Sequence, residues 1–181
     1  MIAIMLSPFF IALQNFADAK ERKLAEGQVL FQQGDKVDAL FLVVSGEIRL
    51  IRYQADGSSI TLQRTQAGSV LAEASLYSYH YHCHALAQRA TCVSALPKET
   101  VIKYLQTDPK FAFNWSGYLA REVQQARFRS ELLSLKTVAA RLDAWLNWQG
   151  QALPAKGEWK VLAEQLGVSA EALYREIARR S

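Results

Sequence analysis

The strongest constraint on the fold is a change in the hydrophobic pattern at Pro97. Between Leu24 and Leu96, short β-type runs are separated by glycine-containing turns about every 11 residues, a spacing typical of an antiparallel sandwich or barrel. The turn signals are Gly34-Asp35, Ser45-Gly46, Ala55-Asp56-Gly57 and Ala67-Gly68. After Pro97 the apolar residues recur with a helical period. We therefore expect an α+β chain in which an antiparallel, jelly-roll-like β-roll precedes a set of helices.

The helical part contains one unusually long element. Residues 98–148 are helical in pattern with an interruption near Asp108-Pro109, and the longer piece runs from about Phe111 to Trp148. Its apolar stripe consists of Trp115, Leu119, Val123, Ala126 and Leu133. A long helix with such a stripe either pairs with a second copy in a parallel dimer or packs on its own roll. We favour the dimer.

A helix-turn-helix is predicted after the linker GQALPAKG at residues 150–157. In VLAEQLGVSAEALYREI, Gly167 supplies the turn, because its conformation is one that a residue with a Cβ resists. Ala163 is small where two helices would cross, and Ser169 is placed to cap the second helix.

The second helix of this motif has the chemistry to recognise DNA in a major groove. A glutamate can accept from cytosine N4, and an arginine can donate twice to guanine. The candidate DNA-binding residues are Ser169, Ala170, Glu171, Tyr174 and Arg175. From Glu158 onward there are four basic and four acidic residues, so no basic patch supports this interpretation over an ordinary helical hairpin.

Composition narrows the class of protein. Half of the 181 residues are hydrophobic, which argues against disorder, and the net charge of +4 is weak evidence for an anionic partner. The two cysteines, Cys83 and Cys92, form neither a disulfide framework nor a CxxC pair, as in a reduced cytoplasmic protein. The apolar start lacks a positive region before it and is interrupted by Pro8. We expect a short helix packed on the domain there, and no membrane partner.

All three histidines fall in the stretch YHYHCHA at residues 79–85. On a strand, His80, His82 and His84 would share one face and Cys83 the other. Such a set suggests zinc, nickel or iron, and H-x-H resembles the metal motif of cupins. Neighbours on a strand face are about 7 Å apart, and neither a nearby glutamate nor a later histidine follows. We expect no metal site, with His80, His82, Cys83 and His84 as weak candidates.

Four segments, in order, carry a family resemblance: GDKVDALFLVVSGEIRL, the set Gly68, Glu73, Ser75 and Leu76, then VAARLDAWL, and finally LGVSAEALYREI. Together they cover nearly the whole chain and resemble the CRP/FNR superfamily of bacterial transcription regulators. The resemblance implies a cyclic-nucleotide-binding-like sensor roll at 1–110, a long dimerisation helix and hinge at 111–149, and a DNA-binding helix-turn-helix at 150–181. It also implies a homodimer on a near-palindromic double-stranded DNA site, with RNA polymerase as a further candidate partner.

The resemblance assigns roles on the recognition helix. Glu171 and Arg175 match the family pair that recognises a G·C-containing core. Ala170 stands where nucleotide-binding members have an arginine, which favours an FNR-like half-site. The family usually adds a β-wing after this helix, and the sequence stops at Ser181, so we expect a truncated DNA-binding domain without a complete wing.

The family's phosphate cassette is only partly kept. Ala72 replaces its first glycine, and its arginine falls on Tyr81 or Cys83. No arginine or lysine lies between Arg64 and Arg89, and a buried phosphate needs a cation or a set of donors. The candidate effector pocket comprises Glu73, Ser75, Leu76, Tyr81, Cys83, Ala126 and Arg127. We expect no tight cAMP binding and an unknown effector; haem is a candidate because some relatives use Cys and His from this part of the roll.

We therefore predict a regulator and not an enzyme, since no serine–histidine–acid set, phosphate loop or paired-carboxylate motif is visible. The alternative is a ligand- or metal-binding β-barrel protein, haem-binding or cupin-like, whose C-terminal helices are only structural.

Overall fold

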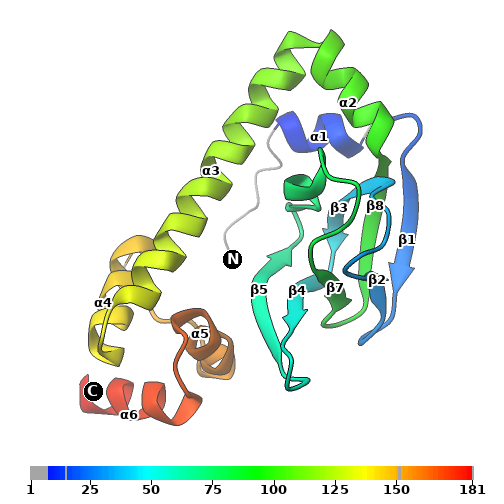
Figure 1. The fold of residues 1–181 in the computed structure, drawn as a ribbon. Helices are drawn as coiled ribbons and strands as arrows, with labels where there is room; N and C mark the ends of the chain where they lie inside the picture. Colours follow the sequence, from blue (N-terminus) through cyan, green and yellow to red (C-terminus); the bar gives the residue numbers. More distant parts are fainter. Residues whose placement is uncertain (1–7, 15, 151, 181) are drawn as a thin grey trace. The chain divides into compact units, whose positions relative to one another are not determined.

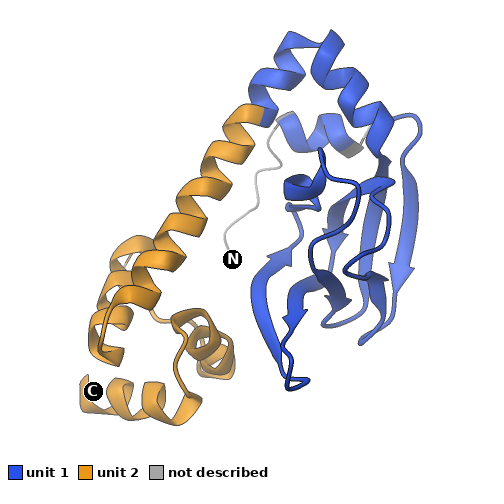
Figure 2. Cartoon of the chain, in the orientation of Figure 1, with its two compact units in different colours: residues 1–115 blue, residues 116–181 orange. Residues whose placement is uncertain are grey.

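A computed structural model describes residues 8–14, 16–150 and 152–180 (Figure 1). The chain divides into two compact units, unit 1 at residues 1–115 and unit 2 at residues 116–181 (Figure 2). The elements of unit 1 are α1 (Pro8–Gln14), β1 (Lys20–Leu24), β2 (Val29–Phe31), β3 (Ala39–Ser45), β4 (Glu47–Tyr53), β5 (Ser59–Gln66), β6 (Val70–Leu71), the short 3-10 helix η1 (Glu73–Ser75), β7 (His84–Ala87), β8 (Thr91–Pro97) and α2 (Lys98–Thr107). The remaining elements are α3 (Pro109–Ser134), α4 (Val138–Gln149), the short 3-10 helix η2 (Lys156–Glu158), α5 (Trp159–Leu166) and α6 (Ala170–Arg180).

The strands of unit 1 form two four-stranded antiparallel sheets, in the orders β1-β8-β3-β6 and β2-β7-β4-β5. Their inner faces enclose one apolar cluster that includes Phe41, Val43, Ile48 and Ala85. The turns that we predicted from the glycine positions lie between β3 and β4, between β4 and β5, and between β5 and β6. The predicted antiparallel roll is therefore confirmed.

The first strand was not predicted. Residues 20–23 belong to the N-terminal segment that we expected to be helical, but with Leu24 they form β1 and pair in register with β8, from Lys20 opposite Ala95 to Leu24 opposite Thr91. Four of the five side chains in β1 are exposed. Charged side chains are common on edge strands, where they discourage further pairing, and this explains why the segment has no hydrophobic strand pattern.

An aromatic cluster joins the helices of unit 1. Phe9 of α1 packs on Phe111 and Trp115, and Phe16 stacks on Tyr104 of α2 at 4.5 Å between ring centroids. The expected N-terminal helix is thus confirmed for residues 8–14, and the part of that expectation on residues 1–7 lies outside the described residues. In the described part of the chain, no helix is long and apolar enough to cross a membrane.

The long helix is interrupted, contrary to the expectation of one element from Phe111 to Trp148. It ends at Ser134, and α4 begins at Val138 after a break. Thr137 caps α4, because its hydroxyl oxygen accepts from the backbone N–H of Ala140 at 3.1 Å. The sequence did not predict this break, because a threonine three residues before an alanine is only a weak sign of a helix start when the surrounding pattern is helical.

Unit 2 is built around one shared core. Phe128 and Leu132 of α3 pack with Leu142 of α4 and with buried side chains of α5 and α6. The helix-turn-helix therefore shares its core with α3 and α4, and the two units divide within α3 and not at residue 150. The turn at Gly167, the burial of Ala163 and the capping of α6 by Ser169 match the prediction.

The residues of the apolar stripe of α3 differ in how far they are buried. Trp115 is buried in unit 1, whereas Val123 is 46% exposed and Leu133 is 56% exposed. The side chains that α3 contributes to the core cluster of unit 2 are Phe128 and Leu132, which lie outside the predicted stripe. The stripe beyond Trp115 is thus left largely uncovered in the monomer.

One turn depends on a close approach of two chain segments. Gly46, with φ of 90°, connects β3 to β4, and a Cβ there would lie 2.6 Å from the backbone oxygen of Ala90. Gly57 also has a left-handed φ of 81°, but a Cβ there would meet nothing within 4 Å.

We predict that Gly46→Ala lowers the free energy of unfolding by about 2–4 kcal/mol, because it adds a backbone clash to the cost of a left-handed alanine. The control Gly57→Ala carries only the left-handed cost, about 1 kcal/mol. Urea unfolding followed by circular dichroism measures both, and equal losses would contradict the role of the close approach.

Candidate functional site

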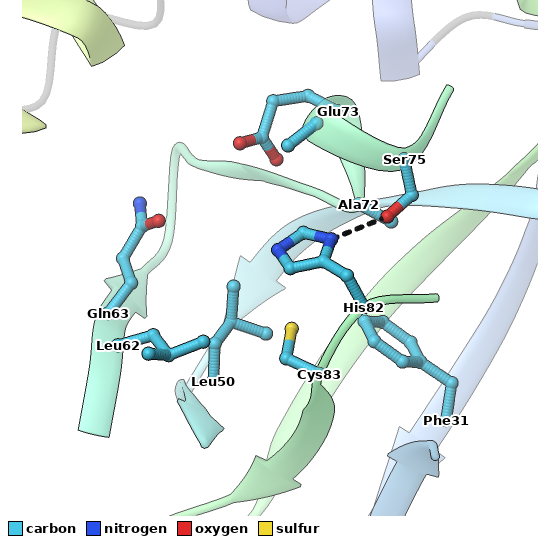
Figure 3. Close-up of a pocket in the computed structure, with 10 residues that line it drawn as sticks. Phe31, Leu50, Leu62, Gln63, Ala72, Glu73, Ser75, His82 and Cys83 are labelled. Carbon is cyan, nitrogen blue, oxygen red and sulfur yellow. Dashed lines mark hydrogen bonds between the residues drawn. The ribbon is translucent and has the colours of Figure 1, made fainter. Parts of the chain in front are cut away.

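A cavity of about 100 Å³ lies in the roll of unit 1 (Figure 3). It is bounded by the sheet β2-β7-β4-β5 on one side and by η1 on the other. The lining residues are Phe31, Leu50, Leu62, Gln63, Ala72, Glu73, Ala74, Ser75, His82 and Cys83. Figure 3 shows Leu50, Leu62 and Gln63 on the sheet side, and Glu73, Ser75 and His82 around the opposite end. The cavity therefore combines apolar walls with a small polar cluster.

The backbone at Ala72 shapes the polar end. Ala72 has a φ of 68°. Among the described residues, every other position with a positive φ is a glycine. Its carbonyl accepts from the N–H of Ser75 at 2.9 Å, which closes the turn of η1. Left-handed alanine costs about 1–2 kcal/mol, and such strain concentrates at functional sites. Ala72 thus adopts a left-handed backbone conformation that a glycine would adopt without strain.

The polar end is organised by a hydrogen bond between Ser75 Oγ and His82 Nδ1, at 2.9 Å (Figure 3). Burial lowers the pKa of His82 below 6.5, and the positive charge of Arg52 lowers the pKa further. The guanidinium of Arg52 donates to the carbonyl of His82 at 3.1 Å and is not among the groups that line the cavity. His82 is therefore neutral near pH 7.

The remaining groups add no positive charge. Cys83 is 2% exposed, and burial raises the pKa of its thiol to about 11, so that it stays protonated. Glu73 contributes a carboxylate, and none of the lining residues is a lysine or an arginine. At neutral pH the cavity suits neutral or hydrogen-bond-donating groups better than an anion.

The structure brings together some of the predicted effector residues and separates others. Glu73, Ser75 and Cys83 line the cavity. Leu76 is buried and is not part of the lining, and Tyr81 stacks on Phe31 at 4.0 Å and donates to the Ala39 carbonyl at 2.7 Å. Ala126 and Arg127 are exposed residues of α3 in unit 2.

Sequence reasoning assigned three of the ten lining residues to the effector pocket and missed the other seven. Ala72, Ala74 and His82 were not assigned to it, His82 being a candidate ligand for a metal or haem, and Phe31, Leu50, Leu62 and Gln63 were not considered. These positions lie on β2, β4 and β5, so that only the pairing of the strands brings them to η1. Their residue types are ordinary for a strand, and the sequence carries no signal that separates them from the rest of the core.

The three histidines do not share a strand face, which corrects the prediction for residues 79–85. β7 begins only at His84, and His80 forms an isolated bridge with Lys36. The ring of His84 packs edge-on against Tyr53, and its Nδ1 accepts from the N–H of Gln33. Each histidine thus has different surroundings, and within the described residues no group of three His, Cys, Asp or Glu side chains is arranged to hold a metal ion.

The recognition helix α6 has one buried and one exposed face. Leu173 and Ile177 are buried in the core of unit 2, whereas Glu171 and Arg175 are exposed and lie four residues apart on the same side of the helix. Ser169 Oγ accepts from the N–H of Ala172 at 3.2 Å and caps the helix. The other two candidates are partly buried: Tyr174 packs near Trp159, at 5.5 Å between ring centroids, and Ala170 packs against the core.

The environment of His82 predicts a pH dependence. Since its pKa is near 6.5 in the unfolded chain and lower in the folded one, the unfolded state takes up a proton first as pH falls. The free energy of unfolding therefore decreases below about pH 6.5, until the folded form is also protonated. His82→Gln should remove this component, and the control His80→Gln should keep it, in urea unfolding at a series of pH values. A proton NMR titration that places the pKa of His82 above that of a free histidine would contradict the prediction.

Comparisons with known proteins identify relatives of this chain. Residues 21–108 match the family model of the cyclic nucleotide-binding domain. The chain is 32% identical over 133 residues to the Cyclic AMP receptor protein of Thermus thermophilus, an alignment that covers 73% of this chain and 60% of that protein. The chain thus spans less than two thirds of the length of that relative.

Two solved structures are similar over most of the chain. The Thermus thermophilus catabolite activator protein is 30% identical with a TM-score of 0.55, and the match covers 89% of this chain and 78% of that one. FixK2 of Bradyrhizobium japonicum shares the fold, with a TM-score of 0.72 and 20% identity over 89% of this chain and 83% of that one. With a cyclic-nucleotide-binding-type roll, a helix-turn-helix and a relative at this level of identity, the chain belongs to the CRP/FNR family of transcriptional regulators.

Proposed function

We propose that this chain acts as a homodimer that binds a near-palindromic site in double-stranded DNA through α6. The observation that carries the proposal is the exposed pair Glu171 and Arg175 on a helix whose opposite face, with Leu173 and Ile177, is held in the core of unit 2. A helix fixed in this way can enter a major groove, where the arginine pairs with guanine and the glutamate with cytosine. Such a regulator acts in the cytoplasm, and contact with RNA polymerase belongs to the same proposal.

The uncovered side of α3 supports the dimer. Val123 and Leu133 are large apolar side chains about half exposed on a 26-residue helix. Pairing of two copies along this stripe would bury both side chains in each copy, as in a coiled-coil seam. A two-fold dimer also places two recognition helices for two half-sites, which explains why the DNA site should be near-palindromic.

We infer that the roll does not bind cAMP tightly, although the Thermus thermophilus relative is named a Cyclic AMP receptor protein. The cavity of about 100 Å³ is well below the roughly 300–1,000 Å³ of typical ligand pockets. Its lining has a carboxylate at Glu73 and a neutral imidazole at His82, and it includes no lysine or arginine. Burial of a phosphate without a paired cation is unfavourable. The roll therefore responds to a signal other than cAMP, or to none.

The alternative of a metal-dependent cupin-like protein finds no supporting observation. In the described chain His80, His82 and His84 have separate partners and form no joint site.

For DNA binding, we predict that Arg175→Ala weakens the affinity for an FNR-like palindrome by about 1–3 kcal/mol per contact and relaxes the preference at the contacted base pair. Fluorescence anisotropy at one fixed salt concentration measures the affinity for the palindrome and for a variant with that base pair changed. The control Arg179→Ala, also on α6, should change the affinity for both DNAs alike. Equal discrimination by the wild type and by Arg175→Ala would show that Arg175 does not select the base.

For the pocket, we predict that titration calorimetry with cAMP near pH 7.5 detects no binding in the micromolar range, because no lysine or arginine lines the cavity to pair with the phosphate. The Thermus thermophilus Cyclic AMP receptor protein, measured in parallel, serves as the positive control. Micromolar binding by this chain, with His82 neutral, would overturn the inference.

A further inference from the structure

The side chain of Arg141, in the first turn of α4, joins the ends of two other helices. Its Nε donates to the carbonyl of Leu135 at 2.9 Å, and its Nη2 donates to that of Leu133 at 3.1 Å. Its Nη1 donates to the carbonyls of Leu166 at 2.8 Å and Gly167 at 2.9 Å. One guanidinium thus binds the C-terminal end of α3 and the C-terminal end of α5.

The last carbonyls of a helix have no partner within the helix and lie at its negative dipole end. The guanidinium is a permanent cation with five donors in a planar fork, and it can satisfy several such carbonyls at once. A lysine in the same place offers one charged nitrogen and cannot span both helix ends in the same geometry. The contact is therefore specific to arginine.

The turn of the helix-turn-helix lies directly against this joint. A Cβ at Gly167 would lie 2.6 Å from Cδ2 of Leu133 and 3.2 Å from Nη1 of Arg141, so the turn approaches the end of α3 as closely as a glycine allows. At its other end, α6 is tied to α4 by Arg180, which binds Asp143 and donates to the Ala139 carbonyl at 3.2 Å. Both ends of the recognition helix are thus connected to α4.

We propose that Arg141 is a positioning residue that sets the direction of α6 relative to the end of α3, and thereby the spacing between the two DNA half-sites that a dimer recognises. The proposal rests on the proposed function, because α3 must carry the dimer seam and α6 must contact DNA. A substitution of Arg141 leaves in the chain Glu171 and Arg175, the residues that we propose to contact the bases.

The joint can be tested without DNA. In Arg141→Lys and Arg141→Gln, amide hydrogen exchange in residues 166–173 should become about tenfold faster, because the turn is no longer held to the end of α3. The control Arg179→Lys changes an exposed arginine that pairs with Glu176 on its own helix and should leave this exchange unchanged. Wild-type exchange rates in both Arg141 variants would overturn the proposal.

The consequence for DNA is tested with palindromes whose half-sites are separated by the preferred distance or by one base pair more or less. One base pair rotates a half-site by about a tenth of a helical turn, so a rigid dimer discriminates between the three DNAs. We expect the ratio of affinities between the best and the altered spacing to fall at least about fivefold in Arg141→Lys, while the affinity for a single half-site stays within about twofold of the wild type.

The outcomes separate the two proposals. Faster exchange with an unchanged spacing preference overturns the positioning role of Arg141 and leaves the DNA-binding function intact. An equal loss on single half-sites and on all spacings, with reduced helical content by circular dichroism, shows that Arg141 only stabilises unit 2 and also overturns the positioning role. If the wild type binds none of these DNAs, the proposed function fails and the positioning role fails with it.

Discussion

Burial of β3 on both of its faces is the constraint on which unit 1 depends. The strand lies between β8 and β6 in its sheet, and Phe41 and Val43 project into the cluster between the two sheets. Leu40 and Leu42 project from the opposite face and are also fully buried. A central strand with two covered faces fixes the register of its neighbours, because a shift of one residue would exchange the two sets of side chains. Since β6 pairs with β3 and leads directly into Ala72 and η1, the polar end of the cavity depends on that register.

The cavity of unit 1 combines a strained turn with a lining that carries no positive charge. Ala72 has a left-handed backbone, and the turn of η1 presents Ser75 and Glu73 to the interior. The segment after η1 brings a neutral His82 and a protonated Cys83 into this lining, which contains no lysine or arginine. The charges of these side chains bear on which ligands the cavity accepts, because burial of an unpaired charge is unfavourable.

In unit 2 the recognition helix is positioned by polar contacts as much as by the apolar core. Leu173 and Ile177 hold the inner face of α6, but apolar contacts alone allow some rotation and sliding of packed helices. The carbonyls bound by Arg141 have defined directions, and they lie on two different helices. The break between α3 and α4, capped by Thr137, allows Arg141 to reach both helix ends.

The sequence by itself determined the local events: the glycine turns of the roll, the switch to helix after Pro97, the turn at Gly167 and the cap at Ser169, because each depends on the conformational preferences of a few adjacent residues. It also determined the family, since the motifs appear in order along the chain. It did not identify β1, whose charged residues form a strand only because β8 offers a partner, nor the break at Thr137 within a continuous helical pattern. Only the tertiary structure decided which residues line the cavity, separated the three histidines and placed Arg141 between two helix ends. Those results depend on contacts between segments far apart in the sequence, and strand pairing and helix packing determine such contacts without leaving a local signal.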